Sequence, residues 1–142
     1  YRYVADAIDF ARQSDVIIVA TSGGPEAAKL VDGAMLDALG PDGVIVNISR
    51  GGVIDETAMV ERLADRRIAG AGLDVFTHEP LADHSPLRAL PNVVLMPHQG
   101  HNVQEFYEVA YADVVENITA FLAGKPIRIL SPQMNASSVQ AI

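Results

Sequence analysis

One stretch of this chain decides its fold: Val46-Asn47-Ile48-Ser49-Arg50-Gly51-Gly52-Val53-Ile54-Asp55. An apolar run from Gly43 to Ile48 leads into it and predicts a buried strand. Arg50 then stands at the carboxyl end of a strand, where open α/β sheets bind ligands. Its planar guanidinium suits a carboxylate, and the glycines after it let the backbone turn tightly beside a ligand. The structural alternative is an arginine that only caps a neighbouring helix or meets solvent.

Length and composition indicate a globular protein. The chain has 142 residues, 49% of them hydrophobic, and a formal net charge of -8, which suffices for one compact domain with a core. Its lysines and arginines form no run that could follow nucleic-acid phosphates. It contains no cysteine, which excludes disulfides, thiolate metal sites and cysteine nucleophiles, and we expect no metal site. No apolar run reaches the length of a membrane span, so we expect a soluble cytoplasmic protein that binds neither nucleic acid nor membrane.

Hydrophobic patterning alternates between helix and strand along the chain. Apolar runs predict four strands, at residues 16–20, 44–48, 68–75 and 93–96, the first of them buried on both faces. Helical spacing or capping predicts helical segments at 4–13, 26–31, 33–39, 55–66, 86–90 and 102–123. Strands that alternate with helices indicate an α/β fold with a parallel sheet and right-handed crossovers. Four strands correspond to the second half of a doubly wound, Rossmann-like sheet with flanking helices.

Loops that follow the predicted strands should meet at one edge of the sheet, and they carry chemically complementary groups. Arg50 could hold a substrate carboxylate, and His98 could give and take a proton near neutral pH. Glu79 could form a hydrogen bond with His98 and so determine its tautomer, while Asp74 could accept a hydrogen bond from a carboxamide. Each group also has a structural alternative, because His98 could be an ordinary loop residue, Glu79 part of a plain turn and Asp74 a turn cap. Their convergence on one sheet edge favours a site.

Several longer motifs resemble the cofactor domain of the D-isomer-specific 2-hydroxyacid dehydrogenases. The matching segments, in chain order, are Asn47–Glu56, Ala69–Phe76, Glu79-Pro80, Leu90–His98 and Ala120–Pro126. The resemblance extends from Tyr3 to Ile127, and the loop Gly23-Gly24-Pro25 is most similar to the glyoxylate and hydroxypyruvate reductase branch.

This resemblance implies an oxidoreductase that transfers a hydride between NAD or NADP and a small 2-oxo or 2-hydroxy acid, of the glyoxylate or hydroxypyruvate type. Arg50 would bind the carboxylate and keto oxygen, and His98 paired with Glu79 would serve as acid and base. Asp74 would meet the nicotinamide carboxamide. A homodimer is also implied, with apolar surface on the long helix and on residues 30–39. The residues that would line the cofactor are Thr21, Ser22, Ile48, Ser49, Arg50, Asp74, His98 and Gly100.

Three parts of the family pattern are missing from these 142 residues. The Gly-rich pyrophosphate turn, the loop that separates NAD from NADP, and the substrate domain are not among them. We therefore expect residues 1–128 to form part of a nicotinamide-cofactor domain and residues 129–142 to return to a substrate domain. By itself, the chain is expected to bind cofactor poorly and to be nearly inactive. The alternatives are a catalytically incomplete fragment, or a nicotinamide-sensing or partner-binding module on the same fold.

A second departure follows His98. The family usually continues there with small residues, then threonine, one further residue and glutamate, whereas this chain has His101, Asn102 and Val103. His101 would stand near the nicotinamide or the substrate, or it could simply begin the long helix.

Overall fold

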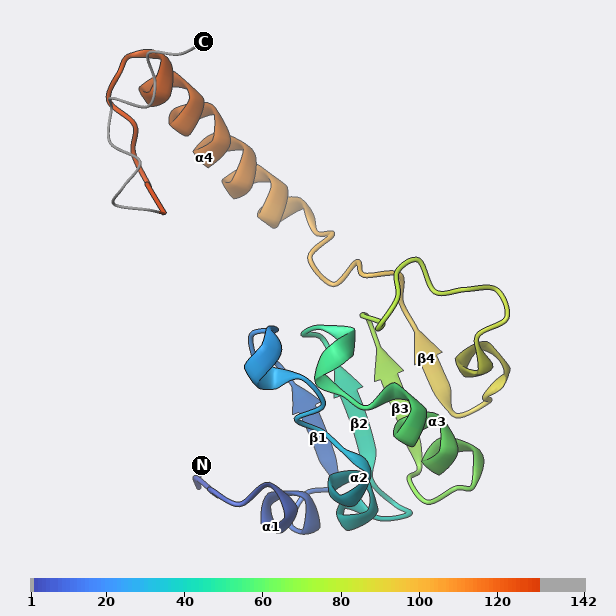
Figure 1. Ribbon diagram of the computed structural model, residues 1–142. Helices are drawn as coiled ribbons and strands as arrows, with labels where there is room; N and C mark the ends of the chain where they lie inside the picture. The colour runs from blue at the N-terminus through green and yellow to red at the C-terminus, as the bar shows by residue number, and fades with distance from the viewer. Residues whose placement is uncertain (1, 131–142) are drawn as a thin grey trace. The chain divides into compact units, whose positions relative to one another are not determined.

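A computed structural model describes residues 2–130 and contains a four-stranded, wholly parallel sheet (Figure 1). Neighbouring strands follow one another in the chain, in the order β1-β2-β3-β4. Their bounds are β1 (Val16–Val19), β2 (Val44–Asn47), β3 (Gly70–Leu73) and β4 (Val93–Leu95). The predicted α/β fold with four parallel strands is therefore confirmed. Most of the predicted tail, from residue 131 onward, lies outside the described residues.

Aspartates begin three of the helices. Asp6, Asp32 and Asp55 each accept a backbone N–H from the first turn that follows, at 2.8 to 3.2 Å, which satisfies a donor that a helix start leaves unpaired. The helices are α1 (Ala7–Arg12), α2 (Gly33–Leu39), α3 (Glu56–Ala64) and α4 (Gln104–Leu122), and the short 3-10 turns are η1 (Pro25–Ala27), η2 (Gly51–Val53) and η3 (Pro86–Ala89).

The helical segment predicted at 26–31 is wrong beyond its first turn. Only η1 forms there, because Val31 is drawn into an isolated parallel bridge with Ile54. The Val31 N–H donates to the Val53 carbonyl at 3.0 Å, and the Val31 carbonyl accepts the Asp55 N–H at 2.9 Å. These bonds tie the connection after β1 to the turn that follows β2.

The core lies on one face of the sheet, under α2 and α3 (Figure 1). The prediction that the first strand is buried on both faces is wrong. Ile17 and Val19 are 3% and 5% exposed, whereas Val16 and Ile18 on the other face are 52% and 62% exposed. A strand points alternate side chains to opposite faces, and α2 and α3 pack on only one of them. The buried cluster comprises Ile17, Val19, Met35, Leu36, Ile45, Leu63, Ile68, Leu73 and Leu87 among others.

The chain forms two compact units, Tyr1–Gly100 and His101–Ile142. The sheet, α1, α2 and α3 belong to the first unit, and α4 belongs to the second. Within the second unit Arg128 bonds to Asp113, Glu116 and Asn117 on α4, at 2.7 to 3.0 Å. Across the part of the chain that the structure describes, no helix is both long and apolar enough to span a membrane.

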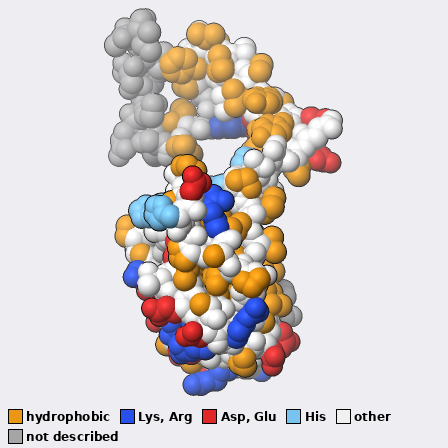
Figure 2. Space-filling model, turned by 90° about the vertical axis from the view of Figure 1, so that its right-hand side faces the viewer, with side chains coloured by type: hydrophobic (Ala, Val, Ile, Leu, Met, Phe, Trp, Pro, Cys, Tyr) orange, Lys and Arg blue, Asp and Glu red, His pale blue; other side chains and the backbone are white. Residues whose placement is uncertain are grey.

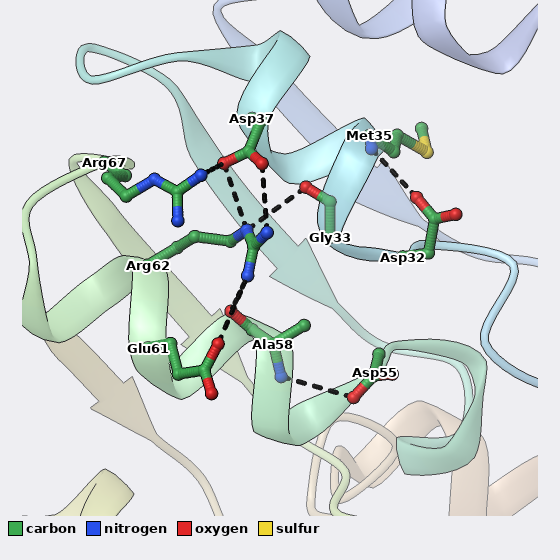
Figure 3. A network of polar contacts seen from close by, with 9 residues as sticks. All are labelled: Asp32, Gly33, Met35, Asp37, Asp55, Ala58, Glu61, Arg62 and Arg67. Atoms are coloured by element: carbon green, nitrogen blue, oxygen red, sulfur yellow. Dashed lines mark hydrogen bonds and ion pairs between the residues drawn. The ribbon is translucent and has the colours of Figure 1, made fainter.

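A network around Arg62 joins α3 to α2 (Figure 3). Its guanidinium donates to both carboxylate oxygens of Asp37, at 3.1 and 3.0 Å, and to the carbonyl oxygens of Gly33 and Ala58, at 3.1 Å each. The side chain is only 13% exposed. The hydrogen bond that Arg62 donates to Asp37 raises the pKa of Arg62, so the guanidinium stays charged. Arg67 reaches the same carboxylate, but its side chain is 47% exposed.

We expect Arg62→Ala to lower the free energy of unfolding by about 2 kcal/mol, because hydrogen bonds to charged groups are lost and the alkyl stem no longer packs. The matched control is Arg67→Ala, which removes an exposed ion pair and should change stability by less than about 1 kcal/mol. Urea unfolding followed by circular dichroism measures both values. Equal effects of the two substitutions would contradict the structural role of Arg62.

Candidate active site

All four strands point their carboxyl ends to the same edge of the sheet (Figure 1). Backbone bonds continue the ladder one residue past the strands, from Ile48 N–H to the Val19 carbonyl at 3.2 Å and from Asp74 N–H to the Asn47 carbonyl at 3.0 Å. Met96 N–H likewise donates to the Leu73 carbonyl at 2.8 Å. The loops that carry the predicted site residues therefore leave one edge together.

His98 and Glu79 form a hydrogen-bonded pair at this edge. His98 Nδ1 lies 2.8 Å from Glu79 Oε2, and the two side chains are 40% and 37% exposed. The other oxygen, Oε1, accepts the backbone N–H of Phe76 at 3.0 Å. Because an ionised carboxylate only accepts hydrogen bonds, Nδ1 is the donor, and Nε2 is the ring nitrogen that can exchange a proton with a substrate.

The same contacts hold the pKa of Glu79 below its ordinary value of 4.5. The hydrogen bond with His98 has the largest effect, the Phe76 N–H the next, and the charge of Arg50 acts in the same direction, while partial burial opposes them. Glu79 is therefore ionised at neutral pH and can balance positive charge on the imidazole.

This lowered pKa predicts an acid-dependent loss of stability. A group whose pKa is lower in the folded chain stabilises it above the unfolded pKa, and that contribution is lost as the pH falls through the folded value. We expect the difference in free energy of unfolding between wild type and Glu79→Gln to shrink below pH 4.5. Urea unfolding at a series of pH values measures it. In a His98→Ala background the pH dependence should weaken, and curves that stay parallel in acid would contradict the pair.

Arg50 shares a cavity with this pair. The cavity has a volume of about 370 Å³ and is lined by Arg50, Gly51, Gly52, Phe76, Thr77, Glu79 and His98. One guanidinium nitrogen, Nη1, donates to the Ser49 carbonyl at 2.8 Å. A volume of this size is enough for a small organic acid. The structure thus brings Arg50, Glu79 and His98 around a single space.

Asn47 supports Arg50 and was not predicted as a site residue. It is 1% exposed, its Nδ2 donates to the Arg50 carbonyl at 3.1 Å, and its Oδ1 accepts the Ser49 N–H at 3.0 Å. Both bonds determine the backbone path where β2 ends. A polar side chain inside an apolar run was the sequence signal for this role, because a buried amide needs partners.

The residues expected to line a cofactor lie in the loops that follow all four strands. Ser49 is buried, and its hydroxyl donates to the Thr21 carbonyl, which joins the loops after β1 and β2; Ser22 adjoins this contact. Ile48 is 56% exposed at the same edge. Asp74 accepts the backbone N–H groups of Gln99 and Gly100, at 2.9 Å each.

His101 belongs to the second compact unit, where its ring lies 5.5 Å from that of Phe106.

A second cavity, of about 360 Å³, lies beside the His98–Glu79 pair. Its lining is mainly apolar and was not anticipated from the sequence; it comprises Phe76, Glu79, Pro80, Leu81, Arg88, Leu95, Met96, Pro97 and His98. Figure 2 shows hydrophobic side chains at the surface among charged ones in a view from the side of Figure 1 on which β4 lies. Within residues 2–130, no cluster of three or more His, Asp or Glu side chains could hold a metal ion.

Comparison with known proteins relates this arrangement to one family. Residues 1–100 match the family model described as "D-isomer specific 2-hydroxyacid dehydrogenase, NAD binding domain". The 2-ketogluconate reductase of Gluconobacter oxydans is 47% identical over 113 residues, which are 80% of this chain and 36% of that protein. The hydroxyphenylpyruvate reductase of Plectranthus scutellarioides is 41% identical over 127 residues, 89% of this chain and 40% of that protein.

A solved structure gives the same relation. The NADPH-dependent glyoxylate/hydroxypyruvate reductase of Sinorhizobium meliloti, in complex with NADP and malonate, has a TM-score of 0.81 and 36% identity. The match covers 89% of this chain and 40% of that one. The chain thus spans about two fifths of the length of these relatives.

Proposed function

Since the chain belongs to the D-isomer-specific 2-hydroxyacid dehydrogenases through their NAD-binding domain, we propose that it serves hydride transfer between NAD or NADP and a small 2-oxo acid, of the glyoxylate or hydroxypyruvate type. One observation carries the proposal: Arg50, Glu79 and His98 surround one cavity at the carboxyl edge of a parallel sheet. A cation for the acid group and a paired imidazole for the carbonyl oxygen are the two groups that this reduction requires.

The edge of the sheet also fits a nicotinamide cofactor. Ile48 exposes an apolar side chain beside the loops after β1 and β3, and Asp74 retains carboxylate lone pairs that a carboxamide could use. A bound nicotinamide supplies or accepts the hydride. The residues that would hold it are Thr21, Ser22, Ile48, Ser49, Arg50, Asp74, His98 and Gly100.

In this proposal the chain's own groups bind the acid and move a proton. Arg50 holds the substrate carboxylate with its unshared N–H groups and polarises the neighbouring carbonyl. His98 Nε2 gives its proton to the carbonyl oxygen as negative charge develops there, and takes a proton from the hydroxyl in the reverse direction. Glu79 keeps the ring oriented and stabilises its charged form, since the pair is already 2.8 Å apart.

We infer that residues 1–128 form part of a nicotinamide-cofactor domain. The protein works as a homodimer, for which exposed apolar side chains on α4, such as Val109 and Val115, and Leu30 near α2 offer contact area.

A chimera tests this function directly. The matching segment of the Sinorhizobium meliloti reductase is replaced by residues 1–128, and oxidation of NADPH is followed with glyoxylate and hydroxypyruvate. We expect turnover, and we expect Arg50→Gln to lower kcat/KM about a hundredfold, because a charge-assisted bidentate contact is lost. A folded chimera that binds NADPH but reduces neither acid would favour the nicotinamide-sensing alternative. The 142-residue chain alone should show no micromolar binding in a nicotinamide fluorescence titration.

A further inference from the structure

Two carboxylates hold the loop that carries His98, here called the His98 loop and defined as residues 97–100. Glu79 holds the ring, through the bond to Nδ1 at 2.8 Å. Asp74 holds the backbone immediately after it, because Oδ1 accepts the Gln99 N–H and Oδ2 the Gly100 N–H, at 2.9 Å each. Asp74 directly follows β3 in the ladder, so the loop is anchored to a strand of the core.

His98 needs such an anchor because of its backbone. Its φ is +55°, in the left-handed region that a residue with a side chain rarely adopts. A residue stays in that region only where its surroundings hold it. The two bonds to Asp74 lie one and two residues beyond this position, where they determine the direction in which the chain leaves His98.

Gly100 completes the anchor. A Cβ at this position would lie 2.9 Å from Asp74 Oδ2, closer than side chains tolerate. Gly100 lies outside the left-handed region, so a side chain there would be strained by this contact and not by its backbone conformation. Because Oδ2 is the end of a side chain, an added Cβ would displace the Asp74 carboxylate from the loop and leave the backbone of the core in place.

We propose that Asp74 is the positioning residue of His98: by binding the Gln99 and Gly100 N–H groups, it sets the His98 loop so that the imidazole meets Glu79. This role is additional to any contact of Asp74 with a cofactor. Its meaning for catalysis rests on the proposed function, but the positioning itself is a property of the chain without ligand.

The pKa of Glu79 reports whether His98 is in place, because the bond from His98 is the main cause of its lowering. In Asp74→Ala, the loss of the carboxylate charge and the displacement of His98 would shift the pKa of Glu79 in opposite directions. Removing a nearby negative charge would lower the pKa of Glu79 further, whereas losing the His98 contact would raise it. Gly100→Ala leaves every charge unchanged and perturbs only the anchor, so it separates the two causes.

The experiment is a pH titration of the Glu79 carboxyl carbon by NMR in the full chain, without cofactor. We expect the pKa of Glu79 to rise toward its ordinary value in Gly100→Ala and in Asp74→Ala, with faster hydrogen exchange at the Gln99 and Gly100 amides. Asp42→Asn, in the exposed turn before β2, is the charge control and should leave the pKa in place.

An unchanged or lowered pKa in Gly100→Ala would overturn the proposal, and that variant decides the matter if Asp74→Ala does not fold. Neither measurement involves cofactor or turnover. A failure of this proposal is therefore distinct from a failure of the proposed function, which the chimera tests.

Discussion

Replacement of His98 by asparagine is expected to lower kcat for the reduction of 2-oxo acids by about a thousandfold, the middle of the range for loss of a positioned acid. Asparagine keeps a polar side chain of similar reach but has no proton to give near neutral pH. Its amide could still donate to Glu79, but it carries no positive charge for that carboxylate to balance, unlike the imidazole 2.8 Å from Glu79. The chimera described above, saturated with NADPH and glyoxylate, provides the measurement.

The control for this loss is His84→Asn, which changes an exposed histidine in the loop before η3. That variant should keep kcat within about twofold, since it removes no group that lines the cavity. If kcat of His98→Asn stays within about tenfold of the kcat of the parent chimera, the proposal that His98 is the general acid is wrong. Binding of NADPH by the variant, measured separately, shows that the site has not simply collapsed.

Replacement of Gly51 by alanine is expected to destabilise the chain by about 3 kcal/mol and to disorganise the site. A Cβ at Gly51 would lie 1.9 Å from the carbonyl carbon of Phe76, 2.1 Å from its oxygen and 2.2 Å from the nitrogen of Thr77. These are backbone atoms, which cannot turn aside as a flexible side chain does. The loop after β3 would have to move, and with it the Phe76 N–H that Glu79 accepts at 3.0 Å.

Gly52→Ala is the matched control, because a Cβ there meets no atom within 4 Å. We expect it to change the free energy of unfolding by less than about 0.5 kcal/mol. Urea unfolding of the two variants side by side makes the comparison. Similar stabilities would mean that the loop after β3 yields easily, and the rigid contact between Gly51 and the Phe76 backbone would then be wrong.

The sequence predicted the positions of the strands more accurately than the burial of their side chains or the conformation of the segments that connect them. The run Val44 to Ile48 indicates a strand because β-branched residues favour extended backbone, and β2 lies within that run. The prediction that Val16 and Ile18 are buried was wrong. An apolar run shows that side chains on both faces of a strand could be buried, but it does not show whether helices cover both faces. The helix predicted over 26–31 failed for a related reason, since Val31 pairs with Ile54, a residue distant in the sequence.

The sequence by itself determined that the strands are parallel, that the loops after them meet at one edge of the sheet, and which motifs relate the chain to its family. Local patterning suffices for these features, because parallel strands joined by helices must end on the same side. Only the tertiary structure decided which groups touch: Glu79 with His98 and Phe76, Asp74 with the His98 loop, Asn47 with Arg50, and Gly51 with the Phe76 backbone. Such contacts join residues from separate loops, and their distances depend on the path of each loop, which no periodicity in the sequence encodes.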